Sequence, residues 1–127
     1  MQQGEMQTLI EQYIDAYNNF DVSKMIELLD ENVVFENYSG SANTHAARGV
    51  REFRELAEKA AALFTEREQR ITAIEFQTAG ATVRVAYSAL LAVDLSDELK
   101  AGQTLQLTGK TIFRFQNNRI SYIADYS

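Results

Sequence analysis

The stretch Met6–Tyr38, MQTLIEQYIDAYNNFDVSKMIELLDENVVFENY, decides the fold of this chain. Its first half predicts an amphipathic helix, because apolar residues recur every three or four positions, at Met6, Leu9, Ile10, Tyr13, Ile14 and Tyr17. Asn18 and Asn19 then break this spacing, and asparagine tolerates the left-handed backbone that ends many helices. Asp21 is suited to cap a second, short helix by accepting a hydrogen bond from a free backbone N–H.

The same stretch continues through the second helix into a strand. The second helix carries its apolar residues, through Leu29, on one side and ends at Asp30–Asn32. Val33–Tyr38 then predicts a strand, on which Phe35 and Asn37 share one face because side chains alternate along a strand. Two helices directly before a strand favour a lid over a curved sheet.

Two tyrosines on the buried face of the first helix allow two interpretations. Tyr13 and Tyr17 are either core aromatics whose hydroxyl groups reach the surface or a buried partner, or residues that bind a ligand. In the second case at least one hydroxyl group points into a cavity and contacts a ligand oxygen. The sequence leaves both interpretations open.

The middle of the chain predicts a loop followed by a third helix. Ser39–Arg48 is small and polar and is punctuated by glycine, so we expect a loop that lines the mouth of a pocket. It contains His45, the only histidine of the chain. From Gly49 onward, apolar residues again recur at helical spacing, at Val50, Phe53, Ala57, Ala60 and Phe64.

The second half of the chain predicts strands. From Glu68 onward the apolar pattern has a period of two, which indicates four strands, at Ile71–Gln77, Thr82–Val93, Thr104–Phe115 and Arg119–Tyr126. Short polar turns, including Asn117-Asn118, join most of them, and such connections favour antiparallel pairing. Helices first and strands last predict an α+β fold rather than an alternating α/β fold.

Length and composition exclude several classes of protein. A chain of 127 residues favours a single domain over residues 1–127. The net charge of −6 argues against nucleic acid or an anionic membrane as the main partner, and no apolar run is long enough to span a bilayer. One histidine and no cysteine cannot build a usual zinc site, and no phosphate-binding glycine motif is present, so we expect no metal and no cofactor. The absence of cysteine and of a signal-peptide pattern favours a cytoplasmic location.

The order of elements resembles the nuclear transport factor two-like superfamily and, within it, the SnoaL-like domains. The resemblance covers essentially the whole chain and rests on four segments in order, IDAYNNFD at 14–21, LLDENVVF at 28–35, RGVREF at 48–53 and TIFRFQNNRI at 111–120. It implies a cone, the cystatin-like α+β barrel, in which a curved antiparallel sheet and three helices enclose an apolar pocket. Many members of this superfamily dimerise through the open face of the sheet.

The resemblance can be tested at the catalytic positions of the ketosteroid isomerases. Tyr13 falls where that family places its oxyanion-hole tyrosine. Asn37, however, falls where the isomerases have their general base, an aspartate, and an amide cannot accept a proton at useful pH. Thr111 falls near a second catalytic aspartate of that family. Ketosteroid isomerase activity is therefore not expected.

Two other residues are candidates for proton transfer. Asp125 resembles the acidic acid/base residue of the SnoaL-like cyclases, and partial burial in the last strand would raise its pKa toward the working range. Its alternative role is that of an edge-strand carboxylate bonded to a neighbour or to water. His45 has a suitable intrinsic pKa for proton transfer, but it is alternatively an exposed loop histidine. Arg48 either clamps an anionic ligand at the pocket mouth or forms a surface ion pair.

Two hypotheses from different classes remain. In the first, the chain is a small enzyme, an isomerase, cyclase or dehydratase, that moves a proton on an apolar, oxygenated small molecule. Asp125 or His45 would be catalytic, and the ligand-binding residues would be Tyr13, Tyr17, Phe35, Asn37, Arg48, Thr111 and Phe113. In the second, the chain is a ligand-binding or association module without chemistry, its cone filled by Phe35, Phe113 and Phe115. We expect a homodimer through the sheet face in the second case.

Overall fold

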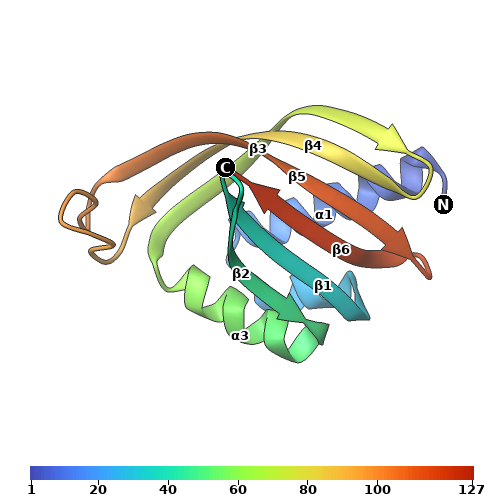
Figure 1. Ribbon diagram of the computed structural model, residues 1–127, viewed down its shortest axis with the longest axis horizontal. Coiled ribbons are helices and arrows are strands. Elements are labelled where there is room, and N and C mark those ends of the chain that lie inside the picture. Colours follow the sequence, from blue (N-terminus) through green and yellow to red (C-terminus); the bar gives the residue numbers. More distant parts are fainter.

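The computed structural model describes residues 1–127 and has an α+β fold (Figure 1). The elements follow one another as α1 (Gln3–Asn18), α2 (Val22–Glu27), β1 (Leu29–Ser39), β2 (Ala42–Arg48), α3 (Gly49–Ala61), β3 (Phe64–Gln77), β4 (Gly80–Leu91), β5 (Thr104–Gln116) and β6 (Arg119–Tyr126). The predicted fold class, a curved sheet wrapped by three helices, is confirmed.

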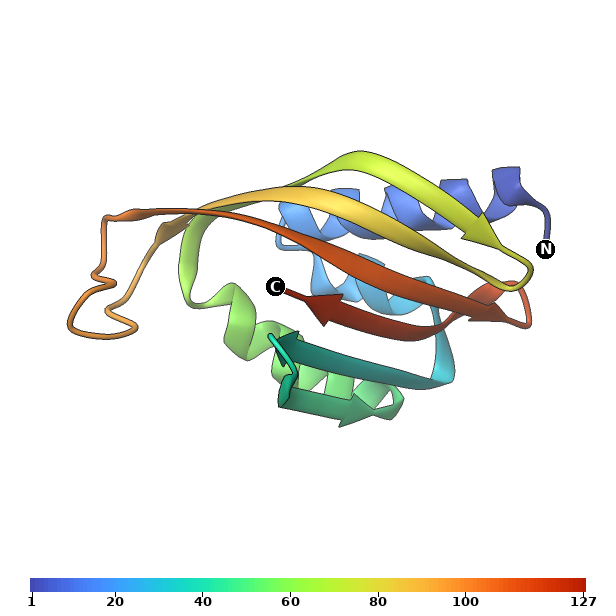
Figure 2. The same ribbon diagram turned by 45° about the horizontal axis from the view of Figure 1, so that its top comes forward.

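A six-stranded sheet with the order β2-β1-β6-β5-β4-β3 forms the body of the protein. Figure 2 shows the sheet curving over the helices, which lie on its concave side. Neighbouring strands pair antiparallel, except β1 and β6, which run parallel. The parallel pair arises because β6 returns to the middle of the sheet, between β1 and β5, instead of extending its edge.

The opening stretch forms the two helices that its apolar spacing predicts. The buried residues of α1 include Met6, Ile10 and Tyr13. Asp21 caps α2, because its Oδ1 accepts a hydrogen bond of 3.1 Å from the backbone N–H of Lys24. The left-handed residue between the two helices is Phe20, with φ of 58°, and not one of the asparagines before it.

β4 begins and ends two residues earlier than predicted, and three larger differences concern β2, β1 and the junction of α3 with β3. Ala42–Arg48 is strand β2 and not a loop, because its backbone pairs with β1 although its side chains are small and mostly exposed. β1 begins at Leu29, immediately after α2, where the sequence predicts helix. Helix α3 ends at Ala61, and Phe64 belongs to β3, which therefore starts well before Ile71.

The core fills one half of the concave face. Its largest fully buried side chains include Phe113 from β5, Ile120 and Ile123 from β6, and Met6 and Ile10 from α1. These residues lie on the inward face of the strands and on the sheet-facing side of the helix. Ile120 and Ile123 are three positions apart and share this face because the β5–β6 pairing shifts register between them. We call this half of the sheet, which α1 covers, the closed half.

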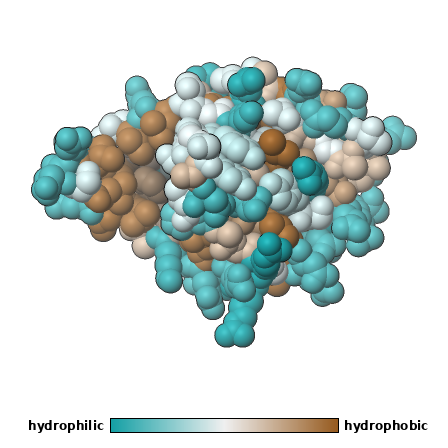
Figure 3. Space-filling model, viewed as in Figure 1, coloured by the Kyte–Doolittle hydropathy of each residue, from teal (hydrophilic) through white to brown (hydrophobic).

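Exposed apolar side chains gather away from the core. Val93, Leu95 and Leu99 are 37 to 42% exposed and lie in the connection between β4 and β5, where Figure 3 shows an apolar area beside the more polar face of the sheet. No helix has the length and apolar character needed to cross a membrane.

Candidate functional site

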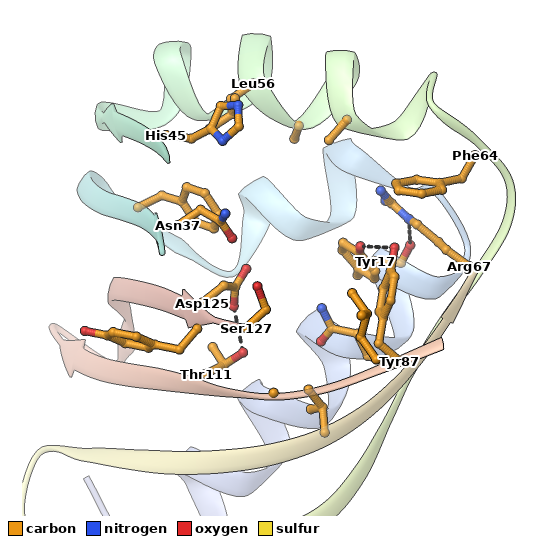
Figure 4. A pocket seen from close by; sticks show the side chains of 18 of the residues that line it. Tyr17, Asn37, His45, Leu56, Phe64, Arg67, Tyr87, Thr111, Asp125 and Ser127 are labelled. Carbon is orange, nitrogen blue, oxygen red and sulfur yellow. Dashed lines mark hydrogen bonds between the residues drawn. The ribbon is translucent and has the colours of Figure 1, made fainter. Parts of the chain in front are cut away.

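A cavity of about 660 Å³ lies on the concave side of the sheet, beyond the core. Fifteen of its 26 lining residues are hydrophobic, so it suits a ligand with an apolar body. Figure 4 shows polar side chains at both ends of the view, with His45, Asn37, Asp125 and Thr111 at one end and Tyr17, Tyr87 and Arg67 at the other. We call the part of the sheet that borders this cavity the open half.

A row of four polar residues crosses the open half on neighbouring strands. The register pairs His45 with Asn37, Asn37 with Asp125, and Asp125 with Thr111, from β2 through β1 and β6 to β5. Directly paired residues share a face and have Cβ atoms about 5 Å apart, and all four line the cavity. The fold thus assembles four predicted site residues from four separate strands.

Asp125 is the carboxyl group of this row. Its Oδ1 accepts a hydrogen bond of 2.6 Å from Thr111 Oγ1, and Oδ2, which has no protein partner, is left to the cavity. Burial raises the pKa of Asp125 to about 6, and the Thr111 hydrogen bond opposes this rise only in part. β6 lies inside the sheet, so Asp125 is not an edge-strand carboxylate.

The other two members of the row are more open to solvent. Asn37 is half-buried, and its Nδ2 donates a hydrogen bond of 2.8 Å to Thr44 Oγ1. His45 is exposed, and its Nδ1 lies 3.1 Å from the same Thr44 oxygen. Because Asn37 stands between them in the register, His45 and Asp125 do not form a directly bonded pair.

Tyr13 links the core to the cavity. Its ring packs edge-on against Phe113, with centroids 5.7 Å apart. Its hydroxyl group has no hydrogen-bond partner in the protein. Every fully buried side-chain oxygen of the protein does have a partner, so the Tyr13 hydroxyl group is accessible, and it faces the cavity that Tyr13 lines. Burial, followed by the nearby charge of Asp125, raises the pKa of Tyr13 well above its usual value. Tyr13 is therefore a protonated donor available to a ligand.

Tyr17 is bound within the protein. Its hydroxyl group donates a hydrogen bond of 3.0 Å to the hydroxyl group of Tyr87 on β4. Burial and this contact raise the pKa of Tyr17 far above its usual value. Burial also raises the pKa of Tyr87, although the bond from Tyr17 opposes the rise. Tyr87 uses its oxygen as an acceptor here, which leaves its own proton free for a ligand.

The C-terminal end of α1 is fixed to β3. Asn18 Nδ2 donates to the backbone carbonyl of Gln69 at 3.1 Å, and Asn18 Oδ1 accepts from the backbone N–H of Gln69 at 2.7 Å. Arg67 Nε donates to the backbone carbonyl of Tyr17 at 2.9 Å. The Asn18 contacts use the free edge of β3, and the Arg67 contact holds the backbone of Tyr17 in place.

Two residues predicted to bind a ligand do not line the cavity. Phe113 is 1% exposed and lies behind Tyr13 in the core, because α1 covers that part of β5. Arg48 is exposed at the end of β2, where its backbone N–H donates to Glu52 Oε1 at 3.0 Å. Phe35 does line the cavity, packed edge-on against Phe53 with centroids 5.8 Å apart.

Sequence reasoning missed Arg67 and Tyr87. Arg67 lies in the charged run Thr65–Glu68, before the position where the sequence predicts the strand to begin. Once β3 is known to start at Phe64, alternation places Arg67, Gln69 and Ile71 on one face. Tyr87 shares the inward face of β4 with Val83 and Val85, and this alternation was the available signal.

Several solved structures share the fold of this chain. A protein from Xanthomonas campestris pv. campestris, described as a proposed polyketide cyclase, is 17% identical, with a TM-score of 0.83 over 98% of this chain and 90% of that chain. An LEH-like epoxide hydrolase from M. tuberculosis is 20% identical, with a TM-score of 0.76 over 97% and 82%. AclR from Streptomyces galilaeus, a proposed hydroxylase, is 17% identical, with a TM-score of 0.77 over 98% and 89%.

At these identities the likeness to solved structures establishes the fold, and the chemistry must be argued from the residues of the site. No curated protein matches the chain. The sequence profile of the SnoaL-like domain matches residues 10–123, which run from the middle of α1 into β6. The chain therefore belongs to the SnoaL-like domain family.

Proposed function

We propose that this protein binds an apolar, oxygenated small molecule in the cavity and transfers a proton on it, as an isomerase, cyclase or dehydratase. The observation that supports this most is Asp125, a carboxyl group with a pKa of about 6 that borders a largely apolar cavity. A general base works best when its pKa lies near the operating pH, and unperturbed aspartates titrate well below it.

In this mechanism Asp125 is the base. At neutral pH it is largely ionised, and Oδ2 removes a proton from a substrate carbon next to a carbonyl group. The Thr111 hydrogen bond to Oδ1 fixes the orientation of the carboxylate during this step. The protonated Asp125 then returns the proton to another substrate atom, which completes an isomerisation or assists the departure of a hydroxyl group.

The negative charge that develops on the substrate oxygen needs a donor. Tyr13 is suited to this role, because its hydroxyl group faces the cavity and its raised pKa keeps the proton in place. A fixed donor in a site with little water stabilises such a charge more strongly than it would in bulk solvent. His45, further along the same row, is a second proton carrier for a substrate long enough to span Asn37.

Proton exchange tests the proposal without knowledge of the natural substrate. A panel of cyclic enones and hydroxylated aromatic ketones is incubated with the protein in deuterium oxide, and loss of the α-proton signal is followed by NMR. We expect the wild-type protein to accelerate exchange on part of the panel, and Asp125→Asn to reduce that rate by about 10²–10⁴-fold. Asp97→Asn, in the exposed β4–β5 connection, is the matched control. Equal exchange by wild type and Asp125→Asn would refute this base.

A second proposal concerns association through the outer face of the sheet. Tyr38 and Tyr126 stack there with ring centroids 4.8 Å apart, and the Arg114 guanidinium lies 4.6 Å from the Tyr122 ring. Tyrosine and arginine are enriched at protein interfaces, so this face supports a homodimer, with or without catalysis. Light scattering over a dilution series measures the mass, and a monomer at every concentration would contradict the dimer.

A further inference from the structure

Arg67 is a buried cation that the proton-transfer mechanism does not use. Its side chain extends from β3 and only 5% of the residue is exposed. The guanidinium group lies 3.7 Å from the centroid of the Tyr17 ring and 4.6 Å from that of Phe20. Its one protein hydrogen bond is the Nε bond to the Tyr17 carbonyl oxygen. These contacts fix the plane of the guanidinium group but leave its charge without a counter-ion.

No carboxylate of the protein neutralises Arg67. The four ion pairs of the structure are formed by other residues, all on the surface. The two Nη atoms of Arg67 have no hydrogen-bond partner in the protein. Every fully buried side-chain nitrogen does have a partner, so the Nη atoms are accessible from the cavity that Arg67 lines. A buried charge is costly unless it is paired, and aromatic stacking compensates this cost only in part.

The cavity as a whole favours an anion. The chain carries 18 acidic residues, yet Asp125 is the one acidic side chain that lines the cavity. Three basic residues line it, Lys59, Arg67 and Lys110. Lys59 is exposed, and the ammonium group of Lys110, a half-buried residue, lies 5.3 Å from the centroid of the Tyr126 ring. Arg67 is thus the buried cation of a cavity inside an acidic protein.

We propose that Arg67 binds the carboxylate group of the ligand, so that the substrate class is an apolar carboxylic acid. This inference rests on the proposed function and specifies it further. The two free Nη atoms form a planar fork that matches the two oxygens of a carboxylate. The free hydroxyl proton of Tyr87, which accepts from Tyr17, supplies a third donor at the same end.

This assignment orients the ligand. Arg67, Tyr17 and Tyr87 lie at one end of the cavity, and Asp125 with Thr111 lies at the other (Figure 4). A carboxylate bound at Arg67 places the apolar body of the ligand along the hydrophobic lining and its opposite end near Asp125. The attraction at Arg67 also keeps the ligand's negative charge away from the Asp125 carboxylate, which would otherwise repel it.

A matched pair of ligands tests the assignment. Naphthoate and naphthamide have the same apolar body and differ in the charge of the head group, and their affinities are measured by calorimetry at neutral pH. We expect the wild-type protein to bind naphthoate at least about tenfold more tightly than naphthamide, because a bidentate ion pair replaces neutral hydrogen bonds. Equal affinities, or no naphthoate binding at millimolar concentration, would overturn the proposal.

Variants of Arg67 locate the preference. We expect Arg67→Gln to abolish the preference for naphthoate, and Arg67→Lys, which keeps the charge but not the fork, to retain part of it. Arg84→Gln removes an exposed charge outside the cavity and is expected to leave the preference unchanged. Thermal unfolding of each variant reports folding, and the wild-type comparison of the two ligands stands even if Arg67→Gln does not fold. A preference that persists in folded Arg67→Gln would overturn the assignment.

The Asp125→Asn variant separates this inference from the proposed function. It is expected to keep the preference for naphthoate, because Arg67 is intact, while losing proton exchange. A naphthoate preference in the wild-type protein without proton exchange, on the panel and on enones and ketones that also carry a carboxylate group, would refute the catalytic proposal alone. Proton exchange without a naphthoate preference would refute the role of Arg67 alone.

Discussion

The closed and open halves of the concave face are built from the same strands, yet they differ in chemistry. In β6, Ile120 and Ile123 are fully buried in the closed half, whereas Asp125, two positions further on, lines the cavity. In β5 the same change occurs between Phe113 and Thr111. Strand alternation turns Asp125 inward with Ile123, and Thr111 inward with Phe113. Ile120 reaches the same face because the β5–β6 register shifts between Ile120 and Tyr122. The overlying helices then determine which inward positions form the core and which border a site.

Tyr13 is the residue at which the two halves meet. Its ring packs against Phe113 in the core, and its hydroxyl group faces the cavity. The rigid packing of the closed half therefore positions a donor in the open half. The comparison predicts that substitutions in the closed half mainly change stability and that substitutions in the open half mainly change ligand chemistry.

The largest expected effect is in the closed half. Phe113→Ala removes a fully buried ring and leaves a cavity beneath Tyr13, so we expect a loss of about 3–5 kcal/mol in the free energy of unfolding, measured with urea. Leu107→Ala, on the same strand but in the open half and 45% exposed, should cost less than about 1 kcal/mol. Similar losses for the two variants would contradict the division of the sheet.

An intermediate effect is expected from Asp125. Folding raises its pKa from 3.8 to about 6, so its protonated form favours the native state. This contribution is complete below pH 3.8 and is lost as the pH rises through about 6. We therefore expect Asp125→Asn to match wild type in acid and to be more stable by about 1–3 kcal/mol above that range.

Urea unfolding at several pH values measures this difference for Asp125→Asn, with Asp97→Asn as the exposed control expected to follow wild type. A variant that is less stable than wild type at neutral pH would show that the ionised carboxylate stabilises the fold. Such a result would indicate that Asp125 has a structural role rather than a role in the site.

The smallest stability effect is expected for Tyr13→Phe. The Tyr13 hydroxyl group has no protein partner, so we expect its removal to change the free energy of unfolding by less than about 0.5 kcal/mol. Tyr17→Phe removes the hydrogen bond to Tyr87 and should cost about 1 kcal/mol. Tyr13→Phe should nevertheless slow proton exchange, measured as above. A larger stability loss for Tyr13→Phe than for Tyr17→Phe would place the Tyr13 hydroxyl group in the core.

Much of the fold is predictable from local patterns. The spacing of Met6, Ile10 and Tyr13 predicts α1, and the strand predicted after the Asn117-Asn118 turn has the bounds observed for β6, Arg119–Tyr126. Asn117 and Asn118 both have positive φ, as a tight hairpin requires. Strand β2 was not predictable in this way, since Ala42–Arg48 has no apolar pattern and becomes a strand by pairing with β1.

The site is predictable in part. Alternation, helical spacing and the family resemblance identify four residues that line the cavity, Asp125, Asn37, Thr111 and Tyr13. Arg67 could not be identified, because a single arginine among charged residues carries no pattern and its burial depends on the contact between α1 and β3. Phe113 and Arg48 were misplaced because sequence does not reveal how far a helix covers a strand or which side chain turns to solvent.

The central position of β6 also has a consequence for biosynthesis. The Tyr122 hydroxyl group donates a hydrogen bond to Glu36 across 86 residues of sequence. The contact forms because β6 is inserted between β1, which is synthesised much earlier, and β5, which directly precedes it in the chain. Until β6 emerges from the ribosome, β1 of the β1–β2 hairpin and β5 of the β3–β5 meander each lack the neighbouring strand with which they pair in the folded protein. Asp125, which belongs to β6, is also absent from the site. Unpaired strand edges invite pairing with other chains. The nascent protein therefore depends on β6 both to join the two parts of the sheet and to bring the Asp125 carboxylate into the site.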